Sequence, residues 1–77
     1  MEFEIEIVRE NMMFDFEIEV ERAIRNVKDG NITEDVAKAK LKGWADCLNF
    51  YDICTVNQHI DMRIMIENAF YEMEQEN

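Results

Sequence analysis

Residues 2–20 read EFEIEIVRENMMFDFEIEV, and the fold class of the chain depends on the structure that this segment adopts. Its first part, from Glu2 to Val8, alternates between acidic and apolar residues. In a β-strand this alternation places the acids on one face and the apolar side chains on the other, whereas on a helix the same residues scatter around the axis. The pattern therefore predicts a half-buried N-terminal strand over about residues 2–8.

The second part of the segment is compatible with two structures. Its apolar residues also alternate with acids, so the whole segment can form a β-hairpin that turns at Arg9–Met13. In a helical register, however, seven apolar residues share one narrow stripe, and Asn11 and Gly30 stand where N-cap and C′ residues are common. The stripe consists of Met12, Met13, Phe16, Val20, Ala23, Ile24 and Val27. The helix, over about residues 12–29, is favoured, and the hairpin is the alternative.

A second helix is predicted over about residues 34–53. Thr33 can cap its N-terminus, and Glu34 and Asp35 suit the positive end of the helix dipole. Its apolar face consists of Val36, Ala37, Leu41, Trp44, Cys47, Leu48, Tyr51 and Cys54. Beside that face runs a line of small residues, which would let another helix approach closely. The line consists of Ala39, Gly43 and Cys47. This helix is therefore expected to be central, with Trp44 buried in the middle of the core.

A third helix is predicted over about residues 56–75. Thr55-Val-Asn-Gln58 has the pattern of a capping box, in which the Thr55 and Gln58 side chains each bond to the other residue's backbone. Its apolar stripe consists of Met62, Met65, Ile66, Ala69, Phe70 and Met73. The alternative is one continuous helix from residue 34 onward, because Gly43 is the only Gly or Pro there. A break is favoured, since a continuous helix would place Thr55 and Gln58 in its apolar seam.

The predicted fold class is mainly α, with an N-terminal β-strand or hairpin followed by a small three-helix bundle. Residues 1–77 are expected to form one small domain, because a chain of this length has room for a single core. Apolar residues make up 48% of the sequence, which argues against disorder despite the many charges.

Charge is distributed in three blocks. Residues 1–21 hold eight acids and one cation, residues 22–43 hold six cations and three acids, and residues 44–77 hold seven acids and one cation. The blocks have net charges of −7, +3 and −6, and the whole chain has −10. An acidic surface repels nucleic acid and anionic membranes and attracts basic protein surfaces. We therefore expect a basic protein surface as partner, and neither direct nucleic-acid binding nor a membrane.

Residue types that carry catalysis are scarce. The chain has no serine, and His59 is its one histidine, so a Ser-His-Asp triad is excluded. Cys47 and Cys54 fall on the apolar face of the predicted second helix, where a thiol is normally an inert hydrophobe. One histidine with surface acids such as Asp52 and Asp61 is too small a ligand set for zinc or iron. We expect no enzyme activity, no metal site and no cofactor.

Two sets of residues are candidates for binding. The first is the acidic N-terminal block, whose carboxylates can satisfy lysine and arginine side chains of a partner. It consists of Glu2, Glu4, Glu6, Glu10, Asp15, Glu17, Glu19 and Glu21. The second is a set of apolar residues that miss the main stripes and are candidates for a self-interface. It consists of Phe14, Ile18, Phe50, Ile53, Ile60, Ile64 and Tyr71.

Three short stretches carry a family resemblance: Lys28-Asp-Gly-Asn-Ile-Thr-Glu-Asp-Val-Ala, Leu41-Lys-Gly-Trp44 and Asp46-Cys-Leu-Asn-Phe50. They resemble helix-turn-helix-like pieces of bacteriophage and mobile-element proteins. The size and acidity of the chain also resemble phage inhibitors of host defence, such as anti-CRISPR proteins and DNA mimics. The chain departs from a pure DNA mimic because the basic middle block interrupts the acids.

The resemblance implies a non-enzymatic acidic binding module, of the phage-inhibitor type, that occupies a basic groove of a host nucleic-acid-handling defence protein. The alternative is a helical structural module that forms homo-oligomers, in which the acids serve only solubility. A cytoplasmic localisation is expected, because residues 1–8 lack the features of a signal peptide and no segment approaches the ~18 apolar residues of a membrane span.

Overall fold

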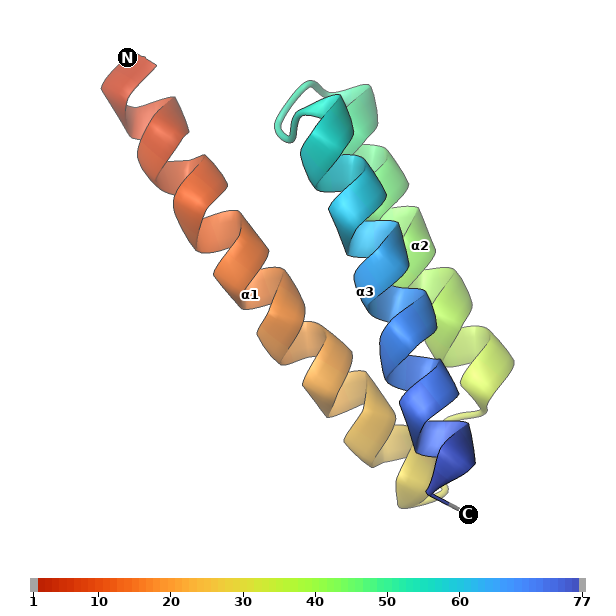
Figure 1. Cartoon of the computed structure of the whole chain (residues 1–77). Coiled ribbons are helices and arrows are strands. Elements are labelled where there is room, and N and C mark those ends of the chain that lie inside the picture. Colours follow the sequence, from red (N-terminus) through yellow and green to blue (C-terminus); the bar gives the residue numbers. More distant parts are fainter. Residues whose placement is uncertain (1, 77) are drawn as a thin grey trace.

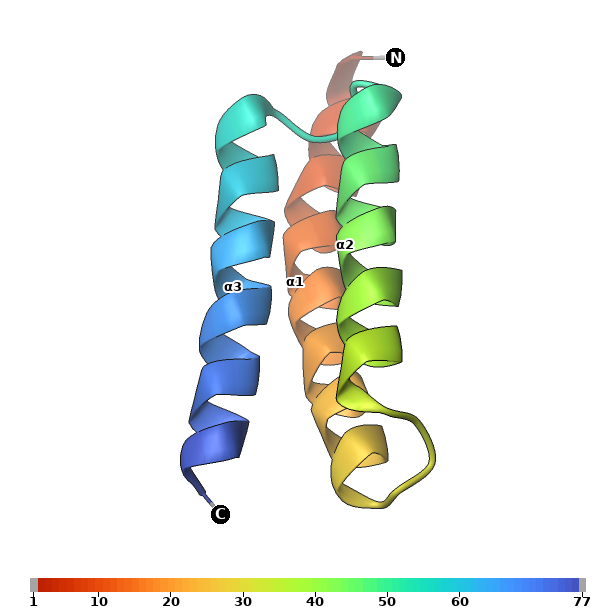
Figure 2. The same ribbon diagram turned by 90° about the vertical axis from the view of Figure 1, so that its right-hand side faces the viewer.

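The computed structural model describes the backbone of residues 2–76 and the side chains of residues 11–76. It contains three helices, α1 (Glu2–Lys28), α2 (Glu34–Phe50) and α3 (Val56–Gln75), in a bundle of 45 × 18 × 16 Å (Figure 1). Helix α2 runs antiparallel to the other two, so α1 and α3 run in the same direction. Figure 2 shows α2 and α3 side by side, joined at their ends by residues 51–55. The predicted helical bundle is confirmed.

The predicted N-terminal strand is wrong, and so is the hairpin alternative. Helix α1 is continuous from Glu2 to Lys28, so Asn11 lies inside it and not at its N-cap, and no strand occurs in residues 2–76. Residues 2–28 contain no Gly or Pro, and glutamate is a good helix former. A helix also satisfies its own backbone groups, whereas a lone strand leaves them unpaired. These effects outweigh the alternation of acids and apolar residues.

The connections between the helices follow local capping rules. Gly30 adopts a φ of +79° after α1, and its amide donates to Val27 O at 3.1 Å while the Asn31 amide donates to Asn26 O at 2.9 Å. This is the Schellman arrangement, in which glycine tolerates the left-handed conformation. At the start of α2, Thr33 Oγ1 accepts a hydrogen bond from the Val36 amide at 3.3 Å.

The turn from α2 to α3 occupies residues 51–55. Helix α2 ends at Phe50, ahead of the expected 53, and Asp52 adopts a φ of +57° just beyond it. The capping box is formed, because the Gln58 amide donates to Thr55 Oγ1 at 3.1 Å and the Thr55 amide donates to Gln58 Oε1 at 2.9 Å. The continuous-helix alternative is therefore wrong.

The core lies along the axis of the bundle and draws on all three helices. Its buried residues are Met12, Phe16, Val20, Ala37, Leu41, Ala45, Cys54, Met62, Ile66, Phe70 and Met73. Two small residues of α2, Ala37 and Ala45, are buried and let its backbone approach the other helices.

Two expectations about α2 are wrong. Trp44 is only half-buried, at the edge of the core, where its ring lies 5.1 Å from the ring of Phe16. The line of Ala39, Gly43 and Cys47 is exposed, and a Cβ added to Gly43 would meet open space. Both errors come from placing the core-facing side of α2 about a fifth of a turn away from where Ala37, Leu41 and Ala45 put it.

Candidate functional site

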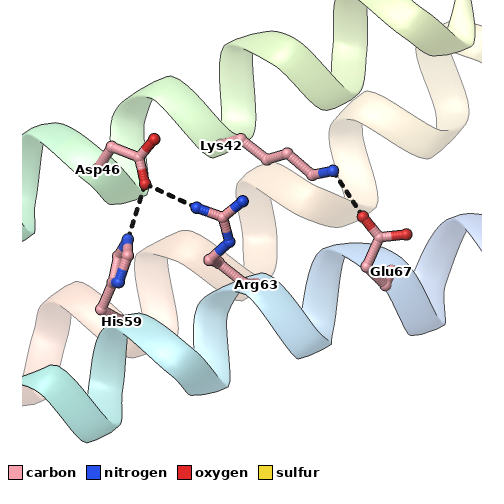
Figure 3. Close-up of polar contacts among 5 residues, drawn as sticks. All are labelled: Lys42, Asp46, His59, Arg63 and Glu67. Carbon is pink, nitrogen blue, oxygen red and sulfur yellow. Dashed lines mark hydrogen bonds and ion pairs between the residues drawn. The ribbon is translucent and has the colours of Figure 1, made fainter.

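The junction between α2 and α3 is closed by polar contacts. Figure 3 shows Lys42 of α2 reaching Glu67 of α3, with Nζ 2.6 Å from Oε1. One turn further along α2, Oδ1 of Asp46 accepts from Nη1 of Arg63 at 3.1 Å and lies 2.8 Å from Nε2 of His59. These contacts form the α2–α3 seam, which consists of Lys42, Asp46, His59, Arg63 and Glu67.

The acids of the seam are held in their charged forms. The hydrogen bond with His59, together with the positive charge of Arg63, lowers the pKa of Asp46. The hydrogen bond and the charge of Lys42 likewise lower the pKa of Glu67. Exposed ion pairs of this kind contribute little stability each, but they fix the register of two neighbouring helices. The seam is therefore internally satisfied and offers no unpaired charge to a partner.

At the far end of the same helix pair, two acids meet. Glu34 begins α2 and lies beside Glu74 near the end of α3. Burial raises the pKa of Glu34, and the Glu74 carboxyl raises it further. Oε1 of Glu34 is buried and has no hydrogen-bond partner among the described residues. Two neighbouring carboxylates repel each other, so this contact is unfavourable when both acids are charged.

The junction between α1 and α2 carries both signs of charge. It contains hollows of about 560 and 220 Å³. Asp15 and Glu19 of α1 line it together with Arg22 and with Lys40 of α2. Arg22 is paired to Glu19, with Nη1 2.7 Å from Oε1. This α1–α2 junction therefore has no net excess of acid at its rim.

The junction between α1 and α3 is different, and it forms the candidate site. Two hollows of about 480 and 210 Å³ lie there, and they form one groove because both are lined by Val20, Glu21, Ala69 and Glu72. Residues of α2 line neither hollow, so the groove opens on the side of the bundle away from α2. We call it the α1–α3 groove.

The rim of this groove is acidic. Glu17 and Glu21 stand on the α1 side, and Asp61 and Glu72 stand on the α3 side. Among the described side chains, none of these four acids forms an ion pair. Lys28 lines the groove beside Glu21 and Glu72 and pairs with Glu76 at its lower end. The two hollows are thus lined by five acids and one cation, Lys28.

The floor of the groove is apolar. Val20 is buried, Met65 and Ala69 are half-buried, and Ile64 stands at the edge with 52% of its surface exposed. An apolar floor between two acidic walls is a different environment from a simple charged surface, because it offers both burial and charge to the same ligand.

The structure divides the acidic set that was predicted to bind a partner. Glu17 and Glu21 lie on the α1–α3 groove, whereas Asp15 and Glu19 lie on the opposite flank of α1. The side chains of Glu2, Glu4, Glu6 and Glu10 lie outside the described residues. Two acids of α3, Asp61 and Glu72, complete the groove and were missed. The available signal was that the first and third helices of an up-down-up bundle run parallel and in contact.

The apolar set that was predicted as a self-interface is also divided. Phe14, Phe50, Ile60, Ile64 and Tyr71 are exposed, with 47 to 78% of their surface accessible. Ile18 and Ile53 are half-buried, and Ile53 packs against the core. Phe14 belongs to α1, Phe50 to α2 and the other three to α3, where Ile64 also lines the α1–α3 groove. The longest row is on α3 and contains Ile60, Ile64 and Tyr71.

Two further properties of residues 11–76 bear on function. No group of three or more His, Cys, Asp or Glu side chains there is arranged to hold a metal ion, and of the two cysteines Cys47 is exposed and Cys54 is buried. None of the helices in the described part of the chain has the length and hydropathy needed to cross a bilayer.

Comparison of the chain with protein-family models, with curated proteins and with solved structures gives no match. The inference about function therefore depends on the geometry of the α1–α3 groove.

Proposed function

We propose that this chain is a non-enzymatic binding module that holds a basic surface of a partner protein in its α1–α3 groove. The observation that carries this proposal is the set of four carboxylates that line the groove over an apolar floor and form no ion pair among the described side chains. The acids are Glu17, Glu21, Asp61 and Glu72.

The physical reason is the energy of uncompensated like charges. Carboxylates that face one another repel, so the folded state keeps them at a cost unless a cation arrives. Lysine and arginine side chains of a partner would remove that repulsion and would be attracted from a distance. The apolar floor would add affinity, because it loses contact with water when it is covered.

The other two junctions are weaker candidates for a partner site. In the α2–α3 seam, Lys42 and Arg63 already neutralise Glu67 and Asp46. In the α1–α2 junction, Arg22 and Lys40 balance Asp15 and Glu19. The excess of negative charge is therefore concentrated where α1 meets α3.

The resemblance to phage inhibitors adds a class of target to this proposal. Nucleic-acid-handling proteins have grooves of Lys and Arg that normally hold phosphates, and an acidic rim presents such a groove with competing anions. A host defence protein of this kind is the target that we predict.

A pair of matched triple variants tests the proposed function. The groove variant neutralises three rim acids, and the control variant neutralises three acids elsewhere, so both change the net charge by the same amount. The groove variant is Glu17→Gln, Glu21→Gln, Asp61→Asn. The control variant is Asp29→Asn, Asp35→Asn, Asp52→Asn. Circular dichroism and thermal melting establish that both fold.

The measurement is capture of partners from a lysate of the source cells, with washes of rising salt. We expect a basic protein that the parent and the control variant retain, that the groove variant loses, and that salt releases, because charge attraction is screened within a Debye length of about 8–10 Å. Equal retention by the groove and control variants would contradict the proposal.

The exposed apolar residues support a second candidate, a module that associates with itself. The row of Ile60, Ile64 and Tyr71 on α3 is the observation that favours it, because exposed apolar rows are uncommon on small monomers. Sedimentation at high salt tests it: an apolar self-interface persists when charges are screened. A single species of 9.2 kDa at micromolar concentration would contradict this candidate.

A further inference from the structure

We infer that the segment held in the α1–α3 groove is an amphipathic helix with an apolar stripe and cations on both of its flanks. This inference rests on the proposed function and adds the shape and the charge pattern of the partner to it.

The shape of the groove favours a helix over other peptide conformations. An extended peptide binds by adding a strand to an open sheet edge, and residues 2–76 contain no strand. A polyproline segment binds to aromatic grooves, whereas the floor here is formed by Val20, Met65 and Ala69. A groove between two helices instead matches a third helix, whose apolar side chains pack into it.

The length of the groove sets the length of the partner segment. Its lining on α3 runs from Asp61 to Glu76, which at 1.5 Å per residue is about 22 Å. A partner helix of roughly 15 residues spans that distance. It would pack against α1 and α3 on the side opposite α2, so the bound state would have the arrangement of a four-helix bundle.

The positions of the acids set the charge pattern of the partner. Glu17 and Glu21 are one turn apart on one wall, so they match two cations one turn apart on one flank of the partner helix. Asp61 and Glu72 stand on the other wall, three turns apart, and match two cations spaced three turns apart on the other flank. The ion pair of Lys28 and Glu76 closes the lower end. The cation-bearing part of the partner therefore ends before Lys28, which would repel it.

The test uses two synthetic peptides of about 15 residues with identical composition. The amphipathic peptide has leucines at helical spacing and lysines on both flanks, and the scrambled peptide has the same residues without that periodicity. Calorimetry measures the affinity of each for the parent, groove variant and control variant, and circular dichroism measures the helix gained on binding. A further variant, Ala69→Gln, places a larger polar side chain on the groove floor while leaving the acids unchanged.

We expect the amphipathic peptide to bind the parent at least about tenfold more tightly than the scrambled one and to become helical when bound. The groove variant and Ala69→Gln should each weaken this binding by about tenfold, whereas the control variant should change it by less than about twofold. Thermal melting shows whether Ala69→Gln is still folded. If it is not, the groove variant alone decides the outcome.

Failure of this inference is distinguishable from failure of the proposed function. If both peptides bind equally and both are weakened in the groove variant, the acidic groove binds basic chains but does not select a helix, and the helix inference is overturned. If neither peptide binds, the helix inference is also overturned, and the capture experiment decides the proposed function separately. If binding is the same in the groove and control variants, both are overturned.

Discussion

The α2–α3 seam and the α1–α3 groove are both lined by charged side chains from two helices, yet their charges behave in opposite ways. In the seam, Asp46 and Glu67 each meet a cation at 2.6 to 3.1 Å. In the groove, Glu17, Glu21, Asp61 and Glu72 form no ion pair with a described side chain, and the one cation of the lining, Lys28, pairs with Glu76. The first arrangement holds two helices together, and the second leaves the carboxylates on which the proposed function rests without an ion pair.

The difference originates in the order of the charge blocks along the chain. The middle block, with a net charge of +3, supplies Lys42 of α2, which pairs with an acid of the third block in α3. The first block is acidic and places its own acids against α3, because α1 and α3 run side by side in the same direction. Net charge alone thus does not locate a binding surface, because the topology determines which blocks meet.

The largest expected effect is a loss of stability of the whole bundle, and with it the groove. Phe16 is fully buried and anchors α1 to the rest of the bundle. Phe16→Ala should lower the free energy of unfolding by about 3–5 kcal/mol, because it leaves a cavity in a small core. Urea unfolding measures this. Phe14→Ala on the same helix is the matched control, and since Phe14 is 64% exposed it should change stability by less than about 0.5 kcal/mol.

The next effect concerns the seam. Asp46→Asn removes the charge that His59 and Arg63 share, and it should lower the melting temperature at pH 7. The pKa of Asp46 is depressed in the folded state, so its contribution is complete above the unfolded value of about 3.9 and is lost as the pH falls through the folded value. The melting temperatures of the two proteins should therefore begin to converge near pH 3.9 and coincide only below the lower, folded-state pKa of Asp46. Curves that stay apart in acid would show that Asp46 acts through packing.

A change in melting temperature of opposite sign is expected at the far end of the α2–α3 pair, where Glu34 and Glu74 meet. The pKa of Glu34 is raised in the folded state by burial and by Glu74, so its charged form opposes folding at pH 7. Glu34→Gln should raise the melting temperature at pH 7. The gain should shrink as the pH falls through the folded value toward the unfolded one, about 4.3, because the parent's own carboxyl then becomes neutral. A gain that is constant with pH would contradict this.

The smallest expected effect is in the groove. The double variant Glu17→Gln, Glu21→Gln removes a like-charge pair one turn apart, which is worth about 0.2–0.5 kcal/mol. Stability should therefore rise slightly, in contrast to the loss at Asp46. Urea unfolding at about 0.01 M and about 1 M salt measures it, because Debye lengths of roughly 30 and 3 Å span the unscreened and screened cases. The gain should be present at low salt and vanish at high salt.

Much of the bundle was predictable from the sequence because the signals that begin and end its helices are local. The Thr55 and Gln58 capping box, the Thr33 N-cap and the turn at Gly30 each involve residues within five positions of one another. The strand over residues 2–8 was predicted wrongly because alternation is also a local signal, but a strand needs a neighbour that this chain does not supply in residues 2–76.

The candidate site was predictable only in part. The acidity of the α1 side, including Glu17 and Glu21, was evident from the sequence. Asp61 and Glu72 were not identified, because they are separated from those acids by 40 or more positions and meet them only through packing of α1 against α3. The predicted stripe of the helix over residues 12–29 already separates Glu17 and Glu21 from Asp15 and Glu19, but which of these two flanks meets α3 depends on how the helices pack.

The parallel course of α1 and α3 has a consequence for the order of folding. Helices α1 and α2, and α2 and α3, are each joined by short turns, so their contacts form between neighbours in the chain. Contacts between α1 and α3 join the two ends of the chain and carry the largest loop-closure cost. A ligand that contacts both walls of the groove would bind only when α1 and α3 are packed together, and it would stabilise the folded chain by mass action. The fraction of chains with bound ligand would therefore report the fraction that is fully folded. Bound ligand would also slow the detachment of α1 from the bundle.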